Sequence, residues 1–131
     1  MKFRTDFVTN SSSSSFVICA KVNLCDSLKS YMADEYGKYG TKLLDEHLMT
    51  SEEVLRDIDE DERWINDIYL GNYECKQIKR VAEDDTDSRY LFAEVYIEDT
   101  EGGVFPEDAL WLYTHIPTAY IDKILETEPN Y

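Results

Sequence analysis

The stretch RYLFAEVYIE, residues 89–98, carries the clearest structural pattern in the sequence. Its side chains alternate between one set, Leu91, Ala93, Val95 and Ile97, and another, Tyr90, Phe92, Glu94 and Tyr96. A period of two is typical of a β-strand with two different faces. We therefore predict a strand at 89–98 that buries Leu91, Val95 and Ile97 on one face.

The residues before this strand predict a turn and a long helix. The run at 83–88 has turn composition, so we expect 73–82 to pair with 89–98 as an antiparallel hairpin. Further upstream, Thr50 and Glu53 have the spacing of a capping box. An apolar stripe follows at Val54, Ile58, Ile65 and Tyr69. We expect one amphipathic helix from Thr50 to Leu70.

The first part of the chain predicts a strand followed by a helix. Phe16 to Leu24 is rich in β-branched and apolar residues, which favours a buried strand. Asp26 or Ser27 is a suitable cap for a helix, which we expect Gly37 and Gly40 to interrupt before a shorter helical piece at 41–48.

The last part of the chain completes the predicted fold. We expect strand pieces at 104–105 and 110–113, split at Pro106, and a final helix that opens at Pro117 and runs through Leu125. The fold class is α+β, with a mostly antiparallel sheet of three to four strands and two to three helices packed on one face. Residues 1–15 form a flexible, basic and Ser-rich segment, and residues 16–131 form a single domain.

Composition narrows the possible partners. The chain of 131 residues is 43% hydrophobic, enough for one core, and its 28 acids against 13 bases give a net charge of −15. This charge repels nucleic acids and anionic lipids, so we expect no direct nucleic-acid binding and no membrane binding. We predict a cytoplasmic protein with reduced cysteines, in which Cys19 and Cys75 are buried in strands.

No catalytic or metal motif stands out. The acids at 57–62 begin like a calcium loop, but Glu62 replaces the turn glycine and Ile68 replaces the closing glutamate. The cysteines and histidines lack zinc-ligand spacing, so we predict no metal and no cofactor. A spatially assembled enzyme site remains an alternative, with Cys75, His115 and the tyrosines as its reactive candidates.

The first 18 residues have a distinctive sequence, MKFRTDFVTNSSSSSFVI. This segment resembles the start of many otherwise dissimilar small proteins of clostridia-like bacteria and their phages. The resemblance implies a bacterial or phage origin and carries over no catalytic residue.

The acids gather in two blocks. Residues 45–62 hold nine acids and one base, and residues 83–108 hold ten acids and one base. An acidic face can occupy the nucleic-acid groove of another protein, whereas scattered acids serve solubility. The leading hypothesis is an interaction protein that inhibits a basic, nucleic-acid-handling host protein such as a nuclease; the alternatives are an enzyme and an accessory domain whose acidity serves only solubility. The predicted partner-binding residues are Asp57, Asp59, Glu60, Asp61, Glu62, Asp84, Asp85 and Asp87.

Overall fold

The computed structural model describes residues 13–60, 64–66, 68–98, 103–105 and 108–127. In chain order the elements are β1 (Ser13–Val22), α1 (Asp26–His47), β2 (Met49–Thr50), α2 (Ser51–Glu60), β3 (Trp64–Ile65), β4 (Ile68–Tyr69), α3 (Asn72–Asp84), β5 (Arg89–Glu98), β6 (Gly103–Phe105), α4 (Asp108–His115), a 3-10 turn (Thr118–Tyr120) and β7 (Ile121–Glu126). No helix of these segments combines the length and the apolar character that a membrane span requires.

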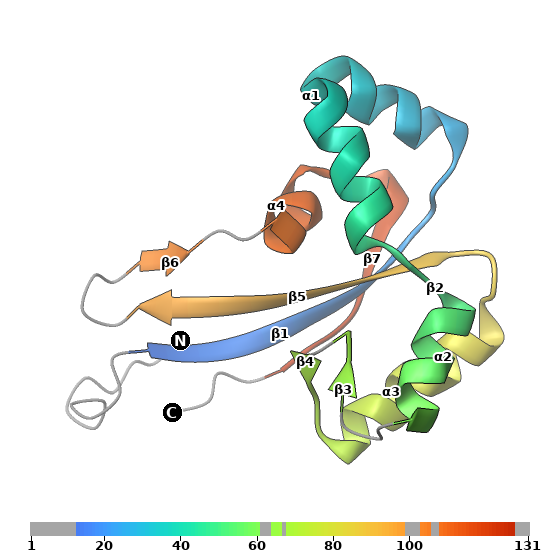
Figure 1. Cartoon of the computed structure of the whole chain (residues 1–131), viewed down its shortest axis with the longest axis vertical. Helices are drawn as coiled ribbons and strands as arrows, with labels where there is room; N and C mark the ends of the chain where they lie inside the picture. Colours follow the sequence, from blue (N-terminus) through green and yellow to red (C-terminus); the bar gives the residue numbers. More distant parts are fainter. Residues whose placement is uncertain (1–12, 61–63, 67, 99–102, 106–107, 128–131) are drawn as a thin grey trace.

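An antiparallel sheet built around β1 and β5 forms the centre of the molecule (Figure 1). The two strands pair over ten residues each, from Ser13 opposite Glu98 to Val22 opposite Arg89. The path through the sheet is β2-β5-β1-β7, and β6 also pairs with β5. This arrangement confirms the α+β class and the mostly antiparallel sheet.

Helices cover both faces of the sheet, which corrects the expectation that they lie on one. Tyr90 and Phe92 pack in a buried cluster with residues of α2 and α3. Leu91 and Ala93, which point the other way, pack in a second cluster with α1 and α4. Figure 1 shows these two pairs of helices on opposite sides of β1 and β5. The alternation at 89–98 therefore separates two buried faces, and aromatic rings fill one of them.

The predicted burial along β5 is confirmed at Leu91 and Val95, whereas the side chain of Ile97 lies outside the described part. The predicted hairpin between 73–82 and β5 is wrong, because 73–82 belongs to helix α3. The apolar residues of α3 that enter the core have helical spacing, Cys75, Ile78 and Ala82. The partner of β5 comes instead from β1, far away in the sequence.

β1 begins earlier than predicted. Ser13–Ser15 continue the strand and pair with residues 96–98 of β5, so pairing outweighs the turn preference of serine here. Residues 1–12 of the segment predicted to be flexible lie outside the described residues.

Helix α1 follows the prediction closely. It begins at Asp26, with Cys25 rather than Asp26 or Ser27 as its N-cap, and it kinks at Gly37. Gly37 has φ of +62°, which side-chain-bearing residues rarely adopt. The predicted interruption at Gly40 is wrong, because helical structure continues through it as far as His47. At Gly40, a Cβ would lie 3.0 Å from the backbone oxygen of Met32, so the absence of a side chain allows close packing.

The long helix predicted from Thr50 to Leu70 is wrong beyond Glu60. Its capping box is confirmed, since the Thr50 N–H donates to Glu53 Oε1 at 2.8 Å and the Glu53 N–H donates to Thr50 Oγ1 at 3.1 Å. After α2, the small β3–β4 hairpin turns through Asn66, whose φ is +53°. Ile65 still joins the same core cluster as Val54 and Ile58, which explains why the stripe looked continuous.

In the C-terminal part, a predicted strand is a helix and a predicted helix is a strand. Residues 110–113, predicted as strand, lie in helix α4, and most of the predicted final helix is strand β7. β7 pairs with β1, but its register shifts between Cys19 and Ala20, which are opposite Leu125 and Lys123. Such a bulge breaks the two-residue period and leaves apolar residues at a spacing that resembles a helix.

Candidate functional site

The eight predicted partner-binding acids do not form one surface. Asp61 and Glu62 lie outside the described residues. Asp59 and Glu60 are exposed where α2 ends, and Asp59 borders a hollow whose other wall is the N-terminal half of α3. Asp84 and Asp87 are exposed where α3 ends. The acids therefore occupy opposite ends of the pair formed by α2 and α3.

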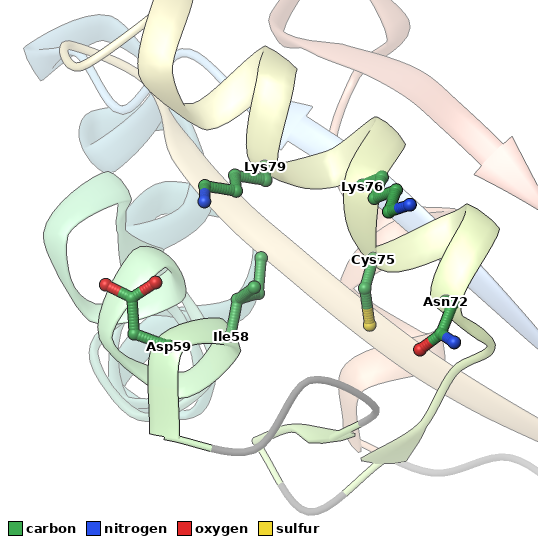
Figure 2. A pocket seen from close by; sticks show the side chains of 6 residues that line it. All are labelled: Ile58, Asp59, Asn72, Cys75, Lys76 and Lys79. Atoms are coloured by element: carbon green, nitrogen blue, oxygen red, sulfur yellow. The ribbon is translucent and has the colours of Figure 1, made fainter.

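The hollow at the Asp59 end is a groove of about 340 Å³ between α2 and α3. Its lining comprises Ile58, Asp59, Asn72, Cys75, Lys76 and Lys79. Figure 2 shows Lys79 directed from α3 toward the side of the groove that holds Asp59. Ammonium groups beside a carboxylate offset its charge, so this end does not present a purely acidic surface.

Cys75 lies at this groove but lacks the surroundings of a nucleophile. The residue is only 2% exposed, and its Sγ lies 4.0 Å from the Leu70 carbonyl oxygen. It is buried in a helix, whereas burial in a strand was predicted; Cys19 is buried in strand β1 as predicted.

The two histidines of the chain are separated from Cys75 by the sheet. His47 and His115 end α1 and α4, whose buried residues pack on the opposite face from the cluster that holds Cys75. A Cys–His pair needs hydrogen-bonding distance, so the structure contradicts a catalytic site that combines Cys75 with His115. Burial raises the pKa of the neighbouring Cys19 thiol, which makes that group less reactive as well.

Two predicted acids stabilise the fold. Asp57 Oδ2 accepts a hydrogen bond of 2.7 Å from the Asn66 N–H, which ties α2 to the β3–β4 turn. Asp85 accepts bonds from the Ser88 hydroxyl at 2.8 Å and the Ser88 N–H at 3.0 Å, and Lys21 Nζ lies 3.2 Å from it. The bonds from Ser88, followed by that from Lys21, lower the pKa of Asp85 to about 2.

A side chain of β5 also holds the loop around Asp85. The Tyr90 hydroxyl donates a hydrogen bond to the backbone carbonyl oxygen of Asp85. Burial, together with the nearby Asp85 charge, raises the pKa of Tyr90 to about 12. This loop is therefore fixed between the end of α3 and the start of β5.

A corner of the molecule gathers acids from both sequence blocks. The start of α2 and the loop after α3 border one open hollow of about 530 Å³, lined by Thr50, Ser51, Glu52, Leu55, Thr86 and Arg89. Glu52 lines this hollow opposite the base Arg89. Four more exposed acids adjoin its lining residues along the chain, and we call the five together the carboxylate corner: Glu52, Glu53, Glu83, Asp84 and Asp87. Three of them, Glu52, Glu53 and Glu83, were not among the predicted site residues, although the two acidic blocks contain them.

Within the described segments, no three His, Cys, Asp or Glu side chains are grouped so that they could hold a metal ion.

Comparison with known protein families, with curated proteins and with solved structures finds no match to this chain.

Proposed function

We propose that the protein is a small acidic interaction protein that binds a basic, nucleic-acid-handling protein through the carboxylate corner. The observation that carries the proposal is the meeting of the two acidic blocks at this corner, where Glu52 and Thr86 border the same hollow. Bound there, the protein competes with the nucleic acid of its partner, because exposed carboxylates and phosphates attract the same basic groove.

The rigid support beneath the corner favours this role. The capping box fixes the start of α2, and Asp85 with Tyr90 fixes the loop after α3. Groups that are already ordered lose less conformational entropy on binding than groups on a mobile segment. Asp85 thus supports the corner in this proposal, whereas Asp57 supports the β3–β4 turn at the other end of α2. The binding role passes to the exposed acids.

The N-terminal resemblance supports a bacterial or phage source, and the proposal assigns the partner to the bacterial cytoplasm. A nuclease of a host defence system has the required chemistry, since it presents a basic groove to nucleic acid.

The test compares two variants that change the net charge equally. The corner variant carries Glu52→Lys, Glu83→Lys and Asp84→Lys, and the control variant carries Asp34→Lys, Asp45→Lys and Glu46→Lys on α1. Each set consists of exposed acids and breaks one exposed ion pair, Glu52 with Arg56 or Glu46 with Lys42. Immobilised proteins would capture partners from the cytoplasmic fraction of a bacterial lysate.

We expect the wild type and the control variant to retain a basic protein that duplex DNA displaces, and the corner variant to lose it. If the two variants retain the same proteins equally, the position of the acids in the fold does not affect binding, and the acids serve only solubility. That result would reject the proposal.

A further inference from the structure

Aromatic side chains cluster on the outer surface formed by α1 and α4. We call this set the ring cluster: Tyr31, Tyr36, Tyr39, Trp111 and His115. The ring centroids of Tyr36 and Tyr39 lie 4.9 and 5.0 Å from that of Trp111, both in edge-to-face geometry. Trp111 and His115 stack with their centroids 4.1 Å apart and their planes 12° apart.

The kink in α1 lies between two of these rings. Gly37 separates Tyr36 from Tyr39, and its positive φ redirects the helix between them. Both tyrosines contact the same tryptophan, one from each side of this break.

The ring cluster remains accessible to solvent. Tyr39 is 48% exposed, and the other four residues are partly exposed. Fully buried aliphatic side chains from the same helices, including Met32, Leu43 and Leu112, already fill the core beneath. The inner edges of the rings therefore pack against the core. Part of the surface of each ring faces solvent.

Carboxylates flank the ring cluster. Asp108, whose side chain is 54% exposed, accepts a 3.0 Å hydrogen bond from the Tyr39 hydroxyl, and its Oδ2 lies 3.9 Å from His47 Nε2. Glu35, which directly precedes Tyr36 in α1, is exposed. A hydrogen bond with Tyr36, then burial and the charges of Tyr36 and Glu35, raise the pKa of Tyr31. Exposed rings beside carboxylates attract cations through both the ring faces and the acid charge.

We propose that the ring cluster, together with Asp108, binds an arginine side chain of a partner protein. A guanidinium group is planar, so it stacks on an aromatic face and donates hydrogen bonds to a carboxylate at the same time, which an ammonium group does less well. Tyrosine, tryptophan and arginine are also the residues that contribute most often to protein interfaces. This surface lies across the sheet from the carboxylate corner, and the proposal does not depend on the function assigned to that corner.

The test uses tryptophan fluorescence in a Trp64→Phe background, which leaves Trp111 as the single tryptophan. The probes are hexa-arginine and hexa-lysine peptides of equal charge. We expect hexa-arginine to bind more tightly and to change the Trp111 emission in a saturable way. Tyr39→Ala should weaken hexa-arginine binding about fivefold or more, and Asp108→Asn should weaken it as well.

Tyr73→Ala is the matched control, because Tyr73 is 73% exposed on α3 and far from the ring cluster in the fold. It should change the dissociation constant less than about twofold, as expected for an exposed residue outside the site. Tyr39→Phe keeps the ring and should bind nearly as well as the wild type. Equal effects of Tyr39→Ala and Tyr73→Ala, or equal affinities for the two peptides, would overturn the proposal, since either result reduces binding to general attraction between opposite charges.

Discussion

The two helical layers of this protein each cover one face of the sheet, but their solvent-facing surfaces differ. The layer of α2 and α3 buries Val54, Ile58 and Ile78 and presents charged residues to solvent. The layer of α1 and α4 buries Leu28, Met32 and Leu112, yet its outer surface also carries the ring cluster. Both layers expose acids, but the described residues that form the ring cluster all belong to the layer of α1 and α4.

This difference shows why net charge alone is a poor guide to function. The charge of −15 describes the whole chain, but bases on α3 beside the groove at Asp59 offset the acids locally. The same chain presents rings near Asp108, where a cation finds both a π surface and a carboxylate. Position within the fold decides which acids are available to a partner.

The largest expected effects test whether both layers are needed. Ile78→Ala and Leu112→Ala each empty a fully buried site, one in each layer. We expect each to reduce the free energy of unfolding by about 2–5 kcal/mol, because each loses apolar burial and leaves a cavity. Urea unfolding measures this. A cost below about 1 kcal/mol for either variant would show that its layer contributes little, contrary to the fold described above.

A smaller effect is expected at the kink between Tyr36 and Tyr39 of the ring cluster. A Cβ at Gly37 would meet nothing within 4 Å, so the cost of Gly37→Ala comes from its φ of +62°. We expect a loss of about 1–3 kcal/mol, together with an altered Trp111 environment in near-ultraviolet circular dichroism. Lys38→Ala, one position along on the exposed surface, is the control and should have little effect.

The support of the carboxylate corner should contribute somewhat less. Asp85→Ala removes the acceptor of the Ser88 bonds and should cost about 1–2 kcal/mol, whereas Asp85→Asn keeps an acceptor oxygen and should cost less. Thermal unfolding of the two variants measures the difference. Equal losses would indicate that the charge of Asp85, and not its geometry, holds the loop.

The pH dependence of Asp85 has a definite sign. Folding lowers its pKa from 3.8 to about 2, so the unfolded chain binds the proton more readily. The stabilisation from Asp85 is therefore complete above about pH 4 and is lost as the pH falls through about 2. The difference in stability between the wild type and Asp85→Asn should shrink over this range; a constant difference would contradict the assigned pKa.

The sequence predicts what local patterns determine. The capping box of Thr50 and Glu53, the kink at Gly37 and the strand at 89–98 depend on near neighbours, and the structure confirms them. The end of α2 and the identity of β7 depend on distant partners: Ile65 reaches the core through a turn, and β7 forms against β1. Single-sequence periodicity does not reveal such pairings. Three acids of the carboxylate corner, Glu52, Glu53 and Glu83, were missed for the same reason, because the two acidic blocks meet only in the folded chain.

The smallest expected effect on stability accompanies the most direct test of the account. The corner variant should unfold within about 1 kcal/mol of the wild type, because exposed ion pairs such as that of Glu52 with Arg56 contribute little. The decisive measurement is the affinity of the captured basic partner for the wild type, the corner variant and the α1 control as the salt concentration rises. Screening acts over about 10 Å near 0.1 M salt. We expect a steep loss of affinity with salt for the wild type and the control, and a weak, nearly salt-independent interaction for the corner variant. Equal salt dependence in all three proteins would contradict this expectation.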